Sequence, residues 1–277
     1  MSGRVLAIPL RAESAPCPYL ADHESRFEHG LLLEYDEESF CRLLEAGFRH
    51  FGRYFFRPAC PGPPGADWCG ACVPLRVDVT RFRPSRDQRR VLRRAAAVTM
   101  EVGPPQYSEE KFEIYRRHKE RFRQAGVPAA GSIVAAGQGS IETIESAESF
   151  HRSFYEGGAF TRECVYRLEG RMIAFSFLDL AGRAASSIYC CFDPAAAALS
   201  PGTLSALREI ELARSVGIPW YYLGYWIGGN RSMRYKMAFR PCEIFDGRRW
   251  RPFRDAAGRY ATDPEGLCIA RPVPLFE

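Results

Sequence analysis

Lysine is nearly absent from this sequence. Only Lys111, Lys119 and Lys236 are lysines among 38 basic residues, and all the others are arginines. Because such a bias can also reflect the base composition of a genome, it does not by itself indicate nucleic-acid binding. The net charge of +5 is modest, so the position of the arginines along the chain carries more information than their number.

Long hydrophobic runs are lacking as well. No apolar segment reaches the ~18 residues that span a bilayer, and the N-terminal MSGRVLAIPLRAES has only a short apolar stretch interrupted by proline. A composition of 46% hydrophobic and 26% charged residues is that of an ordinary globular protein. We therefore expect a cytoplasmic protein with no membrane partner and with one large or two smaller domains, whose ten cysteines do not form a disulfide framework.

Several common catalytic signatures are missing. The sequence contains no HExxH, P-loop or GxSxG motif, and its five histidines stand without metal-ligand spacing. These absences argue against a hydrolase or an NTP-dependent enzyme.

The periodicity of apolar residues predicts a mixed fold. Helical spacing and capping signals predict helices over residues 36–47, from Ser85 onward, and over 108–124, 146–155 and 203–215. Alternating or apolar runs predict strands over residues 54–56, 75–79, 164–168, 172–178, 186–192 and 220–223. The strands from 164 to 192 form an antiparallel meander, followed by a loop ending in glycine, a helix and a further strand, which is the order of GNAT-type acyltransferase folds.

The predicted fold class is therefore α+β or α/β, with a GNAT-like acyltransferase fold and a Cys-rich N-terminal region. Pro104-Pro105 breaks the chain and suggests a domain boundary near residue 100. We expect a Cys-rich region over 1–100, a GNAT-like transferase domain over 101–250 and a C-terminal extension over 251–277.

A loop dense in proline and glycine carries a possible metal site. Cys69 and Cys72 form a CGAC turn, which brings two thiols together as zinc or an iron–sulfur cluster requires, and Cys60 precedes them. Cys17, held in a loop by its flanking prolines, is the natural fourth ligand. The alternative is a redox-active or incidental pair. The other cysteines are predicted to be structural thiols: Cys41, Cys164, Cys190, Cys191, Cys242 and Cys268.

Arginine is concentrated between residues 76 and 94, where eight arginines stand against two aspartates. On a helix beginning at Ser85, one broad face carries Arg86, Arg89, Arg90, Arg93 and Arg94. Such a face can follow a phosphate backbone, with each contact releasing a counterion. The alternative is the solvated helix surface of an arginine-rich protein.

The segment YLGYWIGGNRSMRYKMAFRP, residues 222–241, combines a buried strand with a glycine-bearing basic loop. Tyr225 and Trp226 could stack on a base or ribose, while Arg231 and Lys236 could hold anions. The alternative places the aromatic residues in the core and the arginines at the surface.

Taken in order, these segments resemble the aminoacyl-tRNA protein transferase family, particularly its bacterial aspartate/glutamate leucyltransferase branch. The resemblance covers about five-sixths of the chain and is carried by CPYL from Cys17, FRPACP, CGACVPLRVDVTRFRPSRDQRRVLRR, IYCCFDP and the long segment from PGTLSALREIELARSVGIPW to FRPCE. The chain departs from the family pattern at GPPGADW, which separates Cys60 from the CGAC pair, and at Leu20 and Phe192.

The resemblance implies transfer of leucine or arginine from charged tRNA to proteins or peptides with an N-terminal Asp or Glu, which marks them for N-degron degradation. It also implies that Cys17, Cys60, Cys69 and Cys72 are a ligand set for zinc or an iron–sulfur cluster. The transfer itself is expected to need no cofactor, and no DNA partner is expected.

An aminoacyl ester is already activated, so the enzyme has mainly to position a neutral amine and stabilise the oxyanion. An α-amino group has a pKa of about 7.7–8, so a strong general base is not required. Acceptor-carboxylate candidates are Arg76, Arg231 and Lys236, and the tRNA-binding candidates are Arg86, Arg89, Arg90 and Arg93. Catalytic or positioning candidates in the same cleft are Tyr189, Asp193 and Tyr225.

Two other functions stay open. A GNAT-type acyl-CoA N-acyltransferase is the first, although the loop before Thr203 lacks the Gly-rich pyrophosphate cradle of such enzymes. A non-catalytic RNA-binding or metal-binding protein is the second.

Overall fold

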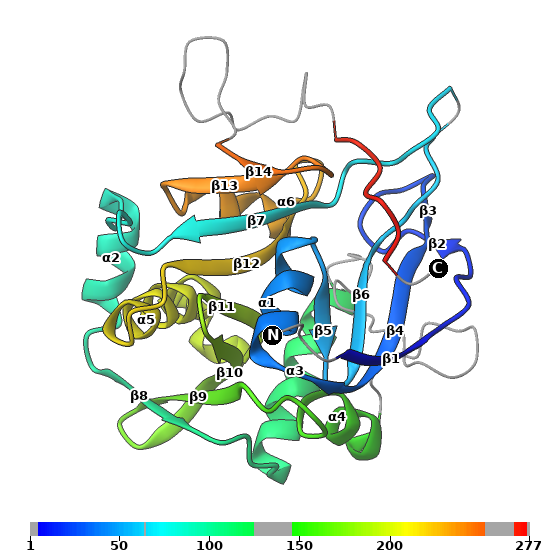
Figure 1. Ribbon diagram of the computed structural model, residues 1–277. Helices are drawn as coiled ribbons and strands as arrows, with labels where there is room; N and C mark the ends of the chain where they lie inside the picture. The colour runs from blue at the N-terminus through cyan, green and yellow to red at the C-terminus, as the bar shows by residue number, and fades with distance from the viewer. Residues whose placement is uncertain (1–4, 64, 125–145, 253–268, 276–277) are drawn as a thin grey trace.

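Two β-sheets with helices around them make up the protein (Figure 1). The computed structural model describes residues 5–63, 65–124, 146–252 and 269–275. The first sheet has four strands in the order β1-β4-β6-β5, and the second has eight in the order β14-β13-β7-β12-β11-β10-β9-β8. The predicted mixture of helices and strands is therefore confirmed.

The four-stranded sheet is antiparallel and is built from the N-terminal part of the chain. Its strands, with the small ribbon of β2 and β3 beside it, are β1 (Val5–Pro9), β2 (Ala15–Pro16), β3 (Glu24–Ser25), β4 (Phe27–Tyr35), β5 (Arg49–Phe51) and β6 (Tyr54–Pro58). Helix α1 (Glu37–Glu45) connects β4 to β5. It begins where Asp36 accepts a hydrogen bond from the backbone N–H of Ser39 at 2.8 Å, an N-cap that the acidic turn in the sequence predicts.

The eight-stranded sheet carries the rest of the fold. Its strands are β7 (Val73–Asp78), β8 (Val98–Gly103), β9 (Thr161–Leu168), β10 (Arg171–Ala181), β11 (Ala184–Phe192), β12 (Trp220–Trp226), β13 (Cys242–Phe245) and β14 (Trp250–Arg251). Strands β9, β10 and β11 form the predicted antiparallel meander, which is confirmed. Strands β11 and β12 are parallel neighbours, which matters for the site described below.

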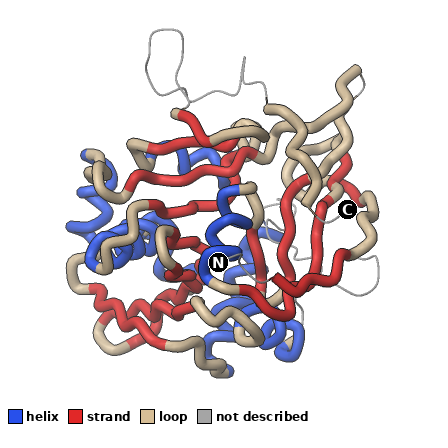
Figure 2. The backbone as a smooth tube through the Cα atoms, in the orientation of Figure 1, coloured by secondary structure: helices blue, strands red, loops and turns tan. Residues whose placement is uncertain are grey.

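Helices cover both faces of this sheet (Figure 2). They are α2 (Arg86–Arg94), α3 (Glu109–Gln124), α4 (Ala147–Phe154), α5 (Pro201–Ser215) and the short α6 (Arg231–Arg234), with 3-10 turns η1 (Pro194–Leu199) and η2 (Tyr235–Ala238). Helix α2 begins with a capping box in which the Ser85 and Gln88 side chains each accept from the other's backbone N–H. None of the described helices combines the length and hydropathy that spanning a bilayer requires.

The hydrophobic cores follow this layering. Between the sheet and α2 and α5 lie apolar side chains that include Val77, Val91, Leu204, Ile210 and Tyr221. On the other face, α3 and α4 pack through an aromatic cluster that includes Tyr115, Phe150, Phe154, Phe175 and Phe177. A third cluster joins α1 and the four-stranded sheet to the ends of β10 and β11, so the two sheets pack together through shared apolar side chains.

The domain boundary predicted near residue 100 does not fall between the two sheets. Strand β7 pairs with both β12 and β13, and β8 pairs with β9, so residues 73–103 belong to the eight-stranded sheet. These partners lie far along the chain, which is why local composition did not show them. Much of the predicted 251–277 extension lies outside the described residues.

Candidate active site

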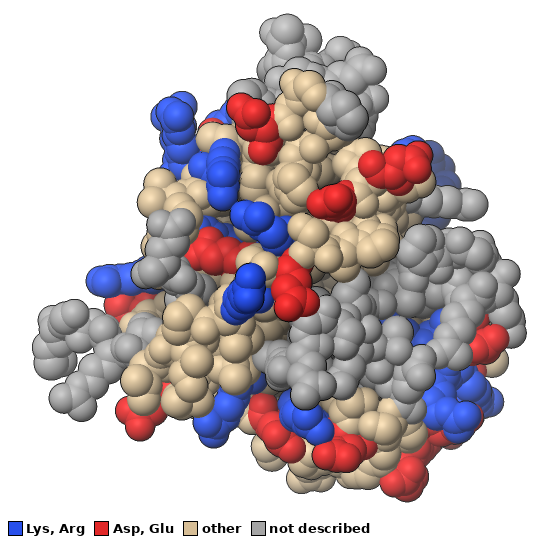
Figure 3. All heavy atoms as spheres, turned by 90° about the vertical axis from the view of Figure 1, so that its right-hand side faces the viewer, with Lys and Arg blue, Asp and Glu red and all other residues tan. Residues whose placement is uncertain are grey.

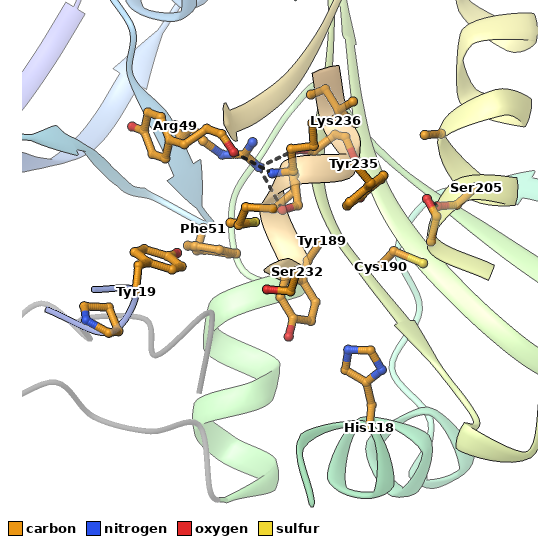
Figure 4. A pocket seen from close by; sticks show the side chains of 18 of the residues that line it. Tyr19, Arg49, Phe51, His118, Tyr189, Cys190, Ser205, Ser232, Tyr235 and Lys236 are labelled. Atoms are coloured by element: carbon orange, nitrogen blue, oxygen red, sulfur yellow. Dashed lines mark hydrogen bonds between the residues drawn. The ribbon is translucent and has the colours of Figure 1, made fainter. Parts of the chain in front are cut away.

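The two parallel strands β11 and β12 separate in the middle of the large sheet. They pair only over Ala184–Ser186 and Trp220–Tyr222. Beyond this point each strand keeps its other neighbour, and a gap opens between them. A cavity of about 440 Å³ lies there, with residues 187–190 of β11 and with Leu223 and Tyr225 of β12 in its wall (Figure 4).

Segments far apart in the sequence complete the wall. The four-stranded sheet contributes aromatic side chains, the start of α5 contributes residues 200–203, and α3 contributes His118 and Arg121. The aromatic and aliphatic side chains of the wall include Phe27, Phe51, Tyr54, Phe56, Ile188, Phe192, Leu223 and Met233. None of the described residues that line this cavity is an aspartate or glutamate. The space is therefore mainly apolar, with a few polar and cationic groups directed into it.

Arg49 is the site residue that the sequence did not reveal. It lies on β5, and its Nη2 donates to the carbonyl oxygen of Ile188 at 2.9 Å and to that of Ser187, where β11 leaves β12. The guanidinium passes directly against Gly224, where an added Cβ would lie 1.7 Å from Nη1. Gly224 also has a φ of +82°, so a glycine is needed there for two reasons. In the sequence, Gly224 directly follows the strand predicted over 220–223, and a glycine at that position does not identify its partner.

Lys236 reaches the same part of the cavity from η2. Only 8% of the residue is exposed, and Nζ donates to the Tyr225 carbonyl oxygen at 3.0 Å. Burial, followed by the positive charge of Arg49, lowers the pKa of Lys236 to about 7, while Cys72 acts in the opposite direction. Figure 4 shows the two cationic side chains directed toward one another. The site thus contains two neighbouring buried cationic side chains.

Two predicted tyrosines line the cavity in different ways. The Tyr189 hydroxyl has no hydrogen-bond partner in the part of the chain that the structure describes, and in Figure 4 it lies between Ser232 and His118. Burial raises the pKa of Tyr189, so the hydroxyl keeps its proton. The Tyr225 hydroxyl instead contacts the Gly47 carbonyl oxygen of the α1–β5 turn at 3.1 Å and the Phe56 carbonyl oxygen of β6 at 3.4 Å, and so ties β12 to the N-terminal sheet.

The thiols and the imidazole of the cavity are neutral. Burial raises the pKa of Cys190 to about 12 and that of Cys72 well above its usual value. Burial, with Arg121 and Lys119, lowers the pKa of His118 to about 3, and its Nδ1 accepts from the Phe192 N–H at 3.4 Å. No thiolate nucleophile is therefore prepared here. Cys190, predicted to be structural, lines the cavity.

Arg76 does not line the cavity. Its guanidinium pairs with Glu243 at 2.7 Å and lies over the rings of Trp220 and Trp250, at 3.9 and 4.6 Å from their centroids. Arg76 is therefore engaged by an ion pair and two indole rings outside the cavity, and it is not placed to hold an acceptor carboxylate there.

Asp193 and Trp226 also lie outside the cavity wall. Asp193 pairs with Arg117 at 3.2 Å and with Arg171, and it accepts from the Ala195 N–H at the start of η1. Trp226 is fully buried in the core, whereas its neighbour Tyr225 lines the cavity, because successive side chains of a strand point to opposite faces. The side chain of Arg231 lies outside the described residues.

The predicted tRNA-binding arginines Arg86, Arg89, Arg90 and Arg93 are exposed on α2. At the end of this helix, Arg94 Nη2 donates to Ser200 Oγ at 2.9 Å, and Ser200 lines the cavity. The arginine helix therefore leads to the rim of the cavity. Figure 3 shows the side away from α2, where basic and acidic side chains are mixed.

The four cysteines predicted to bind metal come near one another. Burial and the neighbouring Cys69 and Cys17 raise the pKa of Cys60 to about 11. Burial also raises the pKa of Cys72, and Cys60, Cys17 and Cys69 act in the same direction. Yet within the described ranges no three His, Cys, Asp or Glu side chains are arranged to hold a metal ion. Cys60 Sγ instead accepts from the Arg26 N–H at 3.4 Å. The ligand role of these four cysteines stays a prediction.

Comparison with known proteins decides the family. Residues 15–90 match the family model "Arginine-tRNA-protein transferase, N terminus", and residues 110–246 match "Arginine-tRNA-protein transferase, C terminus". The chain belongs to the arginine-tRNA-protein transferase family. As the sequence predicts, it is an aminoacyltransferase that depends on tRNA.

Relatives in this family match nearly the whole chain. The chain is 32% identical over 251 residues to an aspartate/glutamate leucyltransferase of Chromobacterium violaceum, covering 90% of this chain and 96% of that protein. It is 33% identical over 243 residues to an aspartate/glutamate leucyltransferase of Halorhodospira halophila, covering 87% and 95%. Among solved structures, FemX overlaps 80% of this transferase and 79% of its own chain with 10% identity and a TM-score of 0.41.

Proposed function

We propose that this enzyme transfers leucine from charged tRNA to the N-terminal Asp or Glu of acceptor proteins and so marks them for degradation. The names of the relatives supply the acceptor class. The observation that favours leucine is the absence of aspartate and glutamate from the described wall of the cavity. A leucyl side chain gains free energy by burying apolar surface there, about 25 cal/mol per Å².

An arginyl side chain, in contrast, would bring a positive charge into this cavity. Its guanidinium would enter a cavity that already contains Arg49, Arg121 and Lys236 and would find no carboxylate on the described wall. Burying a cation without a partner is costly, and like charges add to that cost. Electrostatics therefore disfavours arginine as the donated residue.

The proposed chemistry is direct transfer. The acceptor amine attacks the ester carbonyl, a C–N amide bond forms, the C–O bond to the ribose breaks, and the proton released by the amine ends on the ribose oxygen. The neutral Cys190 and Cys72 thiols provide no covalent route. We assign the Tyr189 hydroxyl as a donor to the oxyanion, because it is protonated and lines the cavity.

Two of the predicted catalytic residues are assigned positioning roles. Tyr225 holds β12 against the N-terminal part of the chain through the carbonyl oxygens of Gly47 and Phe56. Asp193 starts the η1 turn, which leads into the cavity-lining end of α5. Neither role requires direct contact with the substrate.

The tRNA is proposed to lie along α2 with its charged end in the cavity. The exposed arginines and the Arg94–Ser200 contact at the rim support this path. A GNAT-like core is proposed because the substrate space opens where two parallel strands separate. The enzyme is proposed to act in the cytoplasm, where charged tRNA is available.

The test compares donors and acceptors in one assay. Labelled leucine and labelled arginine are presented on their tRNAs to peptides beginning with Asp, Glu or Ala. Leucine is expected to appear on the Asp and Glu peptides, with little arginine incorporated and little transfer to Ala. Equal or faster arginine transfer would overturn the donor assignment.

A further inference from the structure

The floor of the cavity carries two cationic side chains, and the nearest carboxylates, Asp179 and Glu209, lie behind its wall and are engaged by hydrogen bonds of their own. Arg49 and Lys236 both line it, and no aspartate or glutamate does so among the residues that the structure describes. An arginine side chain stays charged at any physiological pH. A buried charge usually needs a partner of opposite sign, so the floor is suited to an anion that arrives with a substrate.

Both side chains keep hydrogen-bond donors for that anion. A guanidinium has five N–H groups and an ammonium has three. Arg49 uses Nη2 for the two β11 carbonyl oxygens, while its Nε and Nη1 make no hydrogen bond to other described residues. Lys236 uses one N–H for the Tyr225 carbonyl oxygen. The remaining donors come from two directions, which suits the two oxygens of a carboxylate.

The position of Arg49 is fixed before any ligand binds. Arg49 is held by its contacts to β11, and the next residue, His50, is also held in place. His50 Nε2 lies 2.7 Å from Asp179 Oδ2, and His50 Nδ1 lies 2.9 Å from the Gly52 carbonyl oxygen. Both ring nitrogens of His50 thus make hydrogen bonds in the buried interior, and β5 cannot shift without breaking these bonds. A rigid donor pair loses little conformational freedom on binding.

A tRNA phosphate is the other anion that could occupy this floor. The exposed arginines of α2 already offer phosphate contacts at the surface, whereas Lys236 is almost fully buried. A backbone phosphate carries a ribose on each side and needs an extended surface, while a side-chain carboxylate ends a flexible chain and can enter a narrow space. The depth of the pair therefore favours a side-chain carboxylate.

We propose that Arg49 and Lys236 together bind the side-chain carboxylate of the acceptor's N-terminal Asp or Glu. This inference rests on the proposed function and assigns its acceptor specificity to a residue pair. Arg49 and Lys236 would then select acidic acceptors, while the apolar wall receives the leucyl side chain.

The test measures acceptor preference in matched variants. Lys236→Gln keeps a donor for the Tyr225 carbonyl but removes the charge, and Lys236→Arg keeps the charge. In Lys236→Gln, kcat/KM for Asp and Glu peptides is expected to fall about 10- to 100-fold, the change that follows loss of a charged hydrogen bond. The kcat/KM for Asn and Gln peptides should change little, so the preference for Asp over Asn should shrink by that factor. Lys236→Arg should retain most of the preference for Asp.

A second measurement needs no variant. Aspartate α-amide, which carries the free amine and the side-chain carboxylate, should compete with the Asp peptide on the wild-type enzyme, and asparagine α-amide should compete at least about tenfold less well. This arm keeps the proposal testable if Lys236→Gln does not fold. Arg49→Lys, which keeps the charge but loses the planar fork, should also reduce the preference for Asp over Asn.

Distinct outcomes separate the possible failures. If the preference for Asp over Asn is unchanged in Lys236→Gln while leucyl-tRNA binding weakens, the pair binds phosphate and the proposal is overturned. Equal competition by the two amides overturns it as well. If wild-type enzyme transfers no leucine to any peptide, the proposed function itself fails, and the amide competition is then measured as protection against thermal unfolding.

Discussion

At the scale of single residues, Gly224 allows Arg49 to enter the sheet. Gly224→Ala would place a Cβ 1.7 Å from Arg49 Nη1 at a position with positive φ. We expect a loss of about 1–3 kcal/mol in unfolding free energy and a marked loss of transfer. Gly103→Ala is the control, because an added Cβ there meets nothing within 4 Å and φ is not positive. Urea unfolding of both variants checks this, and equal stabilities would contradict it.

The protonation of Lys236 should appear in the pH profile. Its pKa is lowered to about 7, so the ammonium is lost as pH rises through 7, well below the pH at which an exposed lysine loses its proton. Because kcat/KM reports the free enzyme, its value for acidic acceptors should fall above pH ~7, while deprotonation of the acceptor amine near pH 7.7–8 acts in the other direction. Lys236→Arg should abolish the fall, and an identical decline in that variant would rule out Lys236 as its cause.

The sequence identified part of the site. Tyr189, Tyr225 and Lys236 stand in recognisable segments, and all three line the cavity. Arg49 could not be found in the same way, because its role depends on carbonyl groups of β11 about 140 positions later. Arg76 illustrates the converse, since its ion pair and stacking partners are also distant in sequence.

At the scale of elements, α2 offers a test of tRNA binding. Arg89→Gln with Arg93→Gln removes two exposed charges from the helix, and should weaken charged-tRNA binding and reduce its salt dependence by about one unit of slope per lost phosphate contact. The matched control is Arg248→Gln with Arg249→Gln, two exposed arginines of the β13–β14 turn. Filter binding over a salt series checks this, and equal effects of the two pairs would show only a loss of net charge.

The buried pair beneath β5 gives a stability prediction. Asp179 is 1% exposed and accepts from Thr161 Oγ1 at 2.7 Å as well as contacting His50. Asp179→Ala should cost about 3–5 kcal/mol in unfolding free energy, because it leaves buried polar groups unpaired. Asp87→Ala should cost at most about 1 kcal/mol, since the Asp87 side chain is 85% exposed in its pair with Arg90. Similar costs for the two would show that the buried pair is not important for stability.

Local signals explain which elements the sequence predicted. Helices α2 and α4 have capping residues within their own first turns, and the β9–β11 meander is joined by short turns. Strand β7 was predicted as a strand, but its partners β12 and β13 are contributed by the far end of the chain. A one-dimensional pattern does not contain such pairings, and the domain division near residue 100 was drawn without them.

At the scale of the whole molecule, both sheets line the same cavity and should unfold together. Arg49 of the four-stranded sheet donates to β11, and Tyr225 of the eight-stranded sheet contacts the Phe56 carbonyl oxygen of β6. Far-UV circular dichroism and tryptophan fluorescence should therefore give one coincident transition. An amide-linked leucyl-adenosine should stabilise the whole transition, by about 2.7 kcal/mol at a hundredfold excess over Kd. Two separate transitions, of which the ligand shifts only one, would contradict this.

The short pairing of β11 with β12 has a consequence for how such enzymes diversify. The substrate space is framed by main chain that has left its neighbour after three residue pairs, and Arg49 holds the separated part of β11 by its carbonyl oxygens. Replacing side chains of the cavity wall can alter which amino acid is donated or which terminus is accepted, while the framework persists. A change of donor or acceptor is therefore expected to need substitutions in the cavity wall and no new arrangement of strands.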